Sequence, residues 1–234
     1  MALAPSTRKL LLEVSTATLT TQMLKRGFRN VYMTGVRPLN EVGRNMVGEA
    51  CTLRYIPARE DLATLESLGS REHPQRRAIE TIAKGRVLVM DCRGEAGAAG
   101  IGAILAARLK VRGAAGFVCD GGVRDVAEAG ALGLPLYAKG PAAPANVTRH
   151  HAVDSNCPIG CGGVAVFPDD VIVGDRDGVV VLPAHLAGEV AEAAAEQERL
   201  EAFLLAQVKG GAPLFGTYPP GEATLLRYRN RRRK

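Results

Sequence analysis

Short apolar runs alternate with polar, glycine-containing turns through the middle of this 234-residue chain. Three of these runs have the length and composition of buried strands: 86–92, 116–120 and 134–140. The segments between them predict two helices, at about 101–112 and 125–131. A β-α-β-α-β order of this kind, with right-handed crossovers, predicts a parallel sheet.

The segments before this core predict helices first and strands second. Residues 6–26 read as helical, with Ser15 or Thr16 capping a second helix and Gly27 ending it. Two strand regions follow, at 30–39 and 46–57. The polar segment 58–79 predicts a helical stretch around 60–68 and then a loop broken at Pro74. This segment is a candidate cover for the mouth of a pocket.

The segments after the core predict a loop, three strands and a long helix. Residues 141–163 are loop-like, and hairpin turns then join three short strands: 163–168, 170–174 and 178–183. The long helix runs from Ala184 to about Val208, and the last 25 residues read as irregular. Together these patterns predict a layered α/β sandwich with a βαβαβ core and a long C-terminal helix, rather than a doubly wound Rossmann sheet. We find no internal repeat or long linker, so we expect one domain over residues 1–226.

The composition narrows the class of protein. Hydrophobic residues make up 47% of the chain and charged residues 23%, which is ordinary for a soluble globular protein. No apolar run approaches the ~20 residues that span a bilayer, and the N-terminus lacks the pattern of a signal peptide. We therefore expect a cytoplasmic protein with no membrane partner. Its odd number of cysteines, five, predicts free thiols rather than a disulfide framework.

The net charge of +6 is concentrated at the C-terminus. The segment 227–234 holds six basic residues, and the rest of the chain is near neutral. We expect this tail to be solvated and disordered, with contact to nucleic acid or an acidic partner as the alternative. The body has no basic stripe interleaved with aromatic residues, so we do not expect it to bind nucleic acid.

The turn DGGVRD, which ends in Arg124 and Asp125, carries the main candidate chemistry. Arginine pairs bidentately with a carboxylate, and aspartate is a hard oxygen ligand suited to Mg²⁺ or Mn²⁺. A metal beside an arginine can hold a 2-oxo acid and stabilise its enolate. Glu128 follows three positions later, on the same side of a helix. The alternative is an N-capping aspartate beside a surface arginine.

A glycine-rich turn, GAAGIGAIL at 97–105, precedes the other core helix. Its backbone N–H groups are candidates for binding a carboxylate, and a tight turn with close helix packing is the alternative. The spacing does not match the dinucleotide fingerprint GxGxxG, and no GxxxxGK[ST] motif is present.

Two further patterns are weaker. A zinc site would need His150, His151, Cys157 and Cys161, but adjacent histidines followed by C-x₃-C is not an established zinc spacing. Nothing in the sequence orients a Cys–His nucleophile pair either. Four aspartates fall in turns, where hairpin chemistry accounts for them: Asp169, Asp170, Asp175 and Asp177.

The chain resembles the RraA-like family, which includes metal-dependent 4-hydroxy-4-methyl-2-oxoglutarate aldolases and regulators of ribonuclease E activity. Three stretches carry this resemblance: GAAGIGAIL, RGAAGFVCDGGVRD and PIGCGGVAVFPDDVIVGDRDGVVVLP. STATLTT and VGEACTLRY add to it, so that it spans roughly residues 10–205. It implies a swivelling β/β/α fold, assembled as a trimer or a dimer of trimers, with sites between subunits.

The resemblance also implies roles for individual residues. Arg124 would bind the 2-oxo acid and Asp125 the metal, so these two are the expected catalytic residues. The turn that receives the substrate carboxylate corresponds to four residues: Gly102, Ala103, Ile104 and Leu105. A glutamate from a neighbouring subunit's C-terminal helix would approach the metal site, and three are candidates: Glu196, Glu198 and Glu201.

One position departs from the family pattern. Family aldolases commonly carry an acidic residue twenty-one positions before the arginine, where this chain has Ala103. Either another carboxylate such as Glu95 replaces it, or the chemistry differs, or activity is low.

The leading expectation is a Mg²⁺- or Mn²⁺-dependent lyase. It would cleave a small 2-oxo acid to pyruvate through an enolate, with oxaloacetate decarboxylation as a side activity. The alternatives are a non-catalytic regulator that binds a ribonuclease and a sugar-acid enzyme on the same scaffold.

Overall fold

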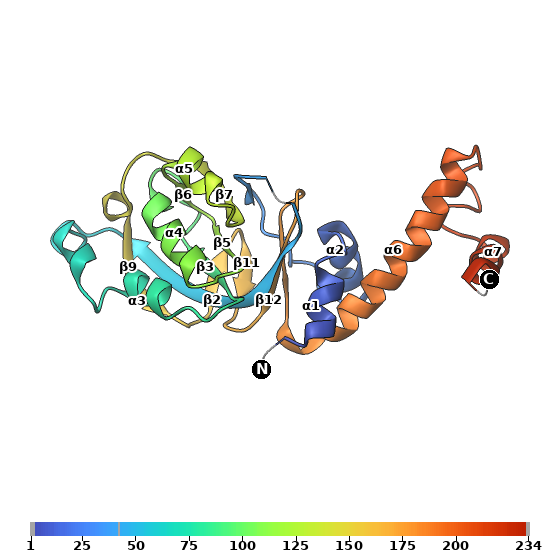
Figure 1. The fold of residues 1–234 in the computed structure, drawn as a ribbon, viewed down its shortest axis with the longest axis horizontal. Coiled ribbons are helices and arrows are strands. Elements are labelled where there is room, and N and C mark those ends of the chain that lie inside the picture. The colour runs from blue at the N-terminus through green and yellow to red at the C-terminus, as the bar shows by residue number, and fades with distance from the viewer. Residues whose placement is uncertain (1–2, 42, 233–234) are drawn as a thin grey trace.

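The computed structural model describes residues 3–41 and 43–232, which form a β-rich body and a protruding helical arm (Figure 1). Within this part of the chain, the main sheet has eight strands in the order β1-β7-β5-β3-β2-β12-β13, with β9 also paired to β2. The strands of the main sheet are β1 (Arg37–Pro38), β2 (Met46–Pro57), β3 (Val87–Asp91), β5 (Gly116–Cys119), β7 (Leu136–Ala138), β9 (His150–Ser155), β12 (Val171–Gly174) and β13 (Val179–Leu182).

Two small sheets flank the main sheet. One contains β4 (Ala99–Ile101), β6 (Gly122–Val123) and β8 (Gly140–Pro141), and the other pairs β10 (Ile159–Cys161) with β11 (Val164–Val166). The described helices are α1 (Pro5–Leu11), α2 (Thr16–Lys25), α3 (Pro74–Thr81), α4 (Ala103–Val111), α5 (Val126–Ala131), α6 (Ala187–Lys209) and α7 (Glu222–Arg232).

The predicted βαβαβ core is confirmed. Strands β3, β5 and β7 pair in parallel, and α4 and α5 connect them. Leu88, Phe117 and Leu136 on successive strands are fully buried in one cluster with residues of these helices. A strand covered on both faces reads as a continuous apolar run, which explains why these strands were visible in the sequence.

Some elements differ from the expectation because long-range contacts create them. β9 and β10 lie in the segment 141–163 that was expected to be a loop, and β9 forms by antiparallel pairing with the far half of β2. Helix α3 begins at Pro74, where a break was expected, because proline suits the first position of a helix. A short 3₁₀ turn, Glu66–Gly69, replaces the helix expected around 60–68.

Three further boundaries need correction. Strand β1 covers only two residues of the expected strand 30–39. Ile101 belongs to β4, so helix α4 starts at Ala103 and buries Ala106 and Leu109. The last 25 residues contain helix α7, so the disorder expected over 227–234 is wrong for residues 227–232; residues 233–234 lie outside the described residues.

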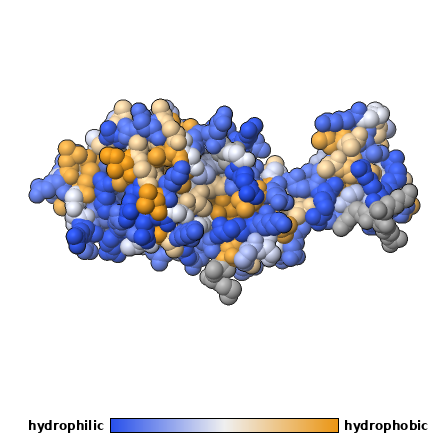
Figure 2. All heavy atoms as spheres, in the orientation of Figure 1, coloured by the Kyte–Doolittle hydropathy of each residue, from blue (hydrophilic) through white to orange (hydrophobic). Residues whose placement is uncertain are grey.

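Helix α6 forms the arm. Its first half packs Val190 and Ala194 against Leu11 and Leu19 of α1 and α2, while its second half leaves the body and meets α7 (Figure 1). At this tip the buried cluster contains Phe203, Leu204 and Tyr228. Figure 2 shows hydrophobic and hydrophilic residues side by side on the surface of the arm's end.

Two expectations from the sequence, free thiols and no membrane-spanning helix, can be compared with the described residues. The cysteines are all unpaired thiols, as their odd number predicted. None of the described helices combines the length and apolar character needed to cross a membrane.

Glu198 ties the arm to the body. Its Oε1 accepts hydrogen bonds from Ser15 N at 3.0 Å and from Ser15 Oγ at 2.8 Å, where Ser15 caps α2. Burial raises the pKa of Glu198, but the hydrogen bonds from Ser15 and Thr18 outweigh burial and the net pKa lies below its ordinary value of 4.5. This carboxylate therefore stabilises the fold in its ionised form.

Replacing Glu198 with alanine is expected to lower the free energy of unfolding by about 1–2 kcal/mol at neutral pH, because Ser15 loses its acceptor. The ionised carboxylate contributes fully above pH ~4.5 and its contribution is lost as the pH falls through the lowered folded-state pKa. The difference between wild type and variant should therefore shrink in acid. Urea unfolding between pH 3.5 and 7 measures both effects. Glu192→Ala, at an exposed position on the same helix, is the control and should change little.

Candidate functional site

The sheet β4-β6-β8 places two helix starts next to each other. Strand β4 pairs in parallel with β6, β4 leads through Gly102 into α4, and β6 leads through Arg124 and Asp125 into α5. The backbone N–H of Arg124 donates to Ile101 O at 3.0 Å and extends this pairing. The two glycine turns singled out in the sequence therefore meet in space.

Asp125 is held against the first turn of α4. Its backbone is left-handed, with φ 54° and ψ 44°, and its Oδ2 accepts a hydrogen bond from Ala103 N at 3.3 Å. Arg124 Nε lies 3.5 Å from Asp125 Oδ1, and both side chains are nearly half exposed. The Asp125 carboxylate is thus anchored to α4, while the Arg124 and Asp125 side chains remain accessible to a ligand.

Gly102 makes this approach possible. A Cβ at this position would lie 2.6 Å from Asp125 Oδ2 and 2.8 Å from Arg124 Cγ. The next two backbone N–H groups, of Ile104 and Leu105, have no acceptor among the described residues. Such N–H groups, together with the helix dipole, favour an anion.

A cavity of about 320 Å³ opens over these residues. The members of the expected site that line it are Gly102, Ile104, Leu105, Arg124 and Asp125. Leu68, Gln75 and Arg76 form another wall, so the polar segment 58–79 does border a pocket, as expected. Ala103, the remaining member of the expected site, does not line the cavity, but its backbone N–H donates to Asp125 Oδ2.

Sequence reasoning missed Gln75, Arg76 and Asn146. Gln75 is fully buried; its Nε2 donates to Gly100 O at 2.5 Å, and its Oε1 accepts from Asn146 Nδ2 at 3.3 Å. These contacts join α3 and the 3₁₀ turn Asn146–Thr148 to β4 at Gly100. The sequence offered one signal for Gln75, its place in the first turn of a helix that begins at Pro74. That signal is readable only if Pro74 is taken as the start of a helix and not as a break.

Several other candidates lie elsewhere. Glu128 sits in the first turn of α5, and Glu95 bonds to Gly97 N at 2.6 Å; neither lines the cavity. Glu196, Glu198 and Glu201 are on α6, on the other side of the body from α4 and α5 (Figure 1).

The zinc alternative gains no support. In the part of the chain that the structure describes, no group of three or more histidine, cysteine, aspartate or glutamate side chains has an arrangement that could hold a metal ion. Cys161 is buried, with its Sγ 3.6 Å from Met90 O, and the pKa of its thiol is raised mainly by burial. A buried, protonated thiol of this kind is inert.

Asp125 is the single carboxylate among the described residues that line the cavity. Zinc sites need three or four protein ligands, but Mg²⁺ usually keeps several waters and uses one or two carboxylates together with its substrate. The donor set therefore fits Mg²⁺ or Mn²⁺ anchored at one point, with Asp125 as the residue that would hold it.

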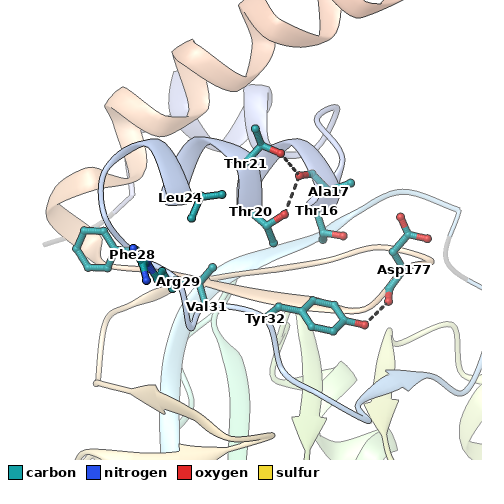
Figure 3. Close-up of a pocket in the computed structure, with 10 residues that line it drawn as sticks. All are labelled: Thr16, Ala17, Thr20, Thr21, Leu24, Phe28, Arg29, Val31, Tyr32 and Asp177. Carbon is teal, nitrogen blue, oxygen red and sulfur yellow. Dashed lines mark hydrogen bonds between the residues drawn. The ribbon is translucent and has the colours of Figure 1, made fainter. Parts of the chain in front are cut away.

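A second cavity of about 460 Å³ lies between α2 and the segment before β1 (Figure 3). Its hydroxyl groups are used internally: Thr20 and Thr21 donate to Ala17 O, and Tyr32 donates to Asp177 O. Leu24 and Phe28 supply an apolar wall.

Comparison with known proteins identifies a family and shared folds. The model of the RraA-like family, described as Aldolase/RraA, matches residues 16–181. A protein of Halalkalibacterium halodurans, provisionally named a 4-hydroxy-4-methyl-2-oxoglutarate aldolase, is 35% identical over 157 residues, which are 67% of this chain and 68% of the relative.

Solved structures share the fold. Streptomyces coelicolor RraAS2, described as an unusual member of the RNase ES inhibitor RraA protein family, superposes with a TM-score of 0.76 at 30% identity, covering 87% of this chain and 97% of the other. An uncharacterised protein from Pseudomonas syringae gives a TM-score of 0.78 at 23% identity, covering 93% and 99% of the two chains.

Replacing Gln75 with leucine should destabilise the site wall. The Gly100 carbonyl and the Asn146 amide would lose their partner in a buried setting, which costs about 1–3 kcal/mol. Urea unfolding measures this loss. Arg77→Ala, an exposed position two residues along α3, is the control. Equal stability of the Gln75→Leu protein and wild type would show that this contact is not a structural link.

Proposed function

The chain belongs to the RraA-like family, and from this premise we propose that it is a divalent-metal-dependent lyase that cleaves a small 2-oxo acid to pyruvate. The observation that carries the proposal is the meeting of Arg124, Asp125 and the first turn of α4 in one cavity. The proposal includes decarboxylation of oxaloacetate, which passes through the same pyruvate enolate, and a cytoplasmic location.

The residues of this chain divide the work by charge. The Arg124 guanidinium is suited to a bidentate pair with the carboxylate of the 2-oxo acid, and the N–H groups of Ile104 and Leu105 offer further donors. When C–C cleavage leaves negative charge on the oxo group, these fixed donors stabilise it without rearranging. A divalent cation held by Asp125, Mg²⁺ or Mn²⁺, would polarise the oxo group as a Lewis acid.

A second copy of the chain is proposed to complete the site. Helix α6 carries its glutamates away from the cavity of its own body (Figure 1). Glu198 is engaged by Ser15 and Glu196 by Arg199 and Tyr228, whereas Glu201 accepts a bond from Gln197 one turn away. Glu201 is therefore the candidate best able to reach a neighbouring subunit's site, in a trimer or a dimer of trimers.

The second candidate function is a regulator that binds a ribonuclease. The similarity to Streptomyces coelicolor RraAS2, at 30% identity over most of the chain, is the observation that favours it. The replacement of the family's usual acidic residue by Ala103 is compatible with either function.

Turnover tests the lyase proposal directly. Purified protein should release pyruvate from oxaloacetate or 4-hydroxy-4-methyl-2-oxoglutarate with Mg²⁺ or Mn²⁺, and EDTA should stop it. Asp125→Asn should lower kcat/KM about a hundredfold or more, because the metal anchor is lost. Glu128→Gln removes a carboxylate that does not line the cavity and should retain activity. Undiminished turnover in Asp125→Asn would refute the assignment, and no pyruvate from wild type would favour the regulator.

Gly102→Ala tests the close approach at the site. The new Cβ should displace the Asp125 carboxylate and the Arg124 side chain, so turnover should fall at least about tenfold. Both displaced groups are flexible and exposed, so Tm should fall by only a few degrees. Gly160→Ala is the matched control, because a Cβ there meets nothing within 4 Å. A Gly102→Ala enzyme with normal kinetics would mean that the approach is not required.

A further inference from the structure

Arg76 lines the cavity from a different element than Arg124. It lies in the first turn of α3, is half-buried, and borders the same space as Arg124, which follows β6. Its Nε donates to Leu68 O at 3.1 Å. This bond fixes the base of the guanidinium and ties the segment before α3 to the cavity wall.

The outer nitrogens of Arg76 have no partner among the described residues. Neighbouring arginines differ in this respect: Arg77 pairs with Glu72 at 3.5 Å, and Arg108 pairs with Glu80 through a bidentate contact of 2.6–3.1 Å. The outer nitrogens of Arg76 are not buried, so they can donate charge-assisted hydrogen bonds to an anionic ligand in the cavity.

The charged groups that line the cavity could pair with two anionic groups of a ligand. Among the described residues that line it, two guanidinium groups face one carboxylate, Asp125, and the first turn of α4 adds its N–H groups. The carboxylate of a 2-oxo acid engages only one of the two arginines if it sits between Arg124 and α4. A monocarboxylic ligand would therefore leave Arg76 unsatisfied.

We propose that Arg76 is the specificity-determining residue of this site and binds the second, distal carboxylate of a dicarboxylic 2-oxo acid. This inference rests on the proposed function for the orientation of the ligand, with its 2-oxo acid end at Arg124. Arg76 acts on binding of the distal group and takes no part in bond cleavage. Its bond to Leu68 O makes the segment before α3 part of the same recognition surface.

Two probes of equal chain length isolate the distal carboxylate. 2-Oxoglutarate and 2-oxopentanoate share the 2-oxo acid end and differ in the terminal group, which is a carboxylate in one and a methyl in the other. Isothermal titration in Mg²⁺ should show that the full-length wild-type protein binds 2-oxoglutarate at least about tenfold more tightly, as expected for a charge-assisted hydrogen bond.

Arg76→Gln should weaken 2-oxoglutarate binding about tenfold to a hundredfold and leave 2-oxopentanoate binding within about twofold. Arg77→Gln, the adjacent arginine that does not line the cavity, is the matched control and should keep the wild-type preference. An equal loss for both probes would mean that Arg76 only supports the wall through Leu68, and it would overturn the inference. Wild-type protein that binds neither probe, or both equally, would also overturn it.

The turnover assay separates this inference from the proposed function. An Arg76-dependent preference for 2-oxoglutarate without pyruvate release from either oxaloacetate or 4-hydroxy-4-methyl-2-oxoglutarate would refute the lyase and leave the ligand class standing. Metal-dependent pyruvate release with an unchanged preference in Arg76→Gln would refute the role of Arg76 and leave the lyase standing.

Discussion

The site depends on one close approach, in which the Asp125 carboxylate meets the first backbone N–H of α4. Parallel pairing of β4 with β6 sets the two turns side by side, the left-handed backbone at Asp125 turns its side chain toward α4, and the missing Cβ at Gly102 leaves room for it. Each condition is local, but none is sufficient alone. The position of Arg124, one residue earlier, follows from the same geometry, so the residues proposed to bind substrate and metal share one structural origin.

Most of the strands that the sequence predicted correctly are buried along nearly their whole length, so that their own residues form a recognisable apolar run. Val87–Asp91 and Gly116–Cys119 are covered on both faces, so their apolar runs identify them without knowledge of their partners. β9 could not be found in this way, because its pairing with β2 joins residues about 100 positions apart. The same limit applied to Gln75 and Asn146, which contact each other across 71 positions. Arg124 and Asp125 could be named as candidate site residues from the sequence because they are adjacent within one motif.

Helix α6 shows how one residue type serves different roles along one helix. Glu198 binds Ser15 at the cap of α2 and holds the arm to the body, whereas Glu201 lies three residues further toward the C-terminal end of α6. Residue type alone could not separate these roles, since all three candidate glutamates fall within six positions. Their hydrogen-bond partners separate them. Ser15, which caps α2, binds Glu198, and Tyr228 of α7 binds Glu196, whereas Glu201 is bound by Gln197 of α6 itself.

Ala103 changes the electrostatic balance of the cavity. An acidic side chain at this position would add a second negative charge beside Asp125, strengthening the attraction for a cation and weakening that for an anion. With alanine here and Arg76 in another wall, the described residues that line the cavity include two positive side chains and one negative one. Under the proposed function, ligand binding would then rely less on a metal and more on the two guanidinium groups, which would hold a ligand by its ends. A site of this kind would select ligands by the spacing of their anionic groups. It could therefore bind a ligand without the acidic residue that Ala103 replaces.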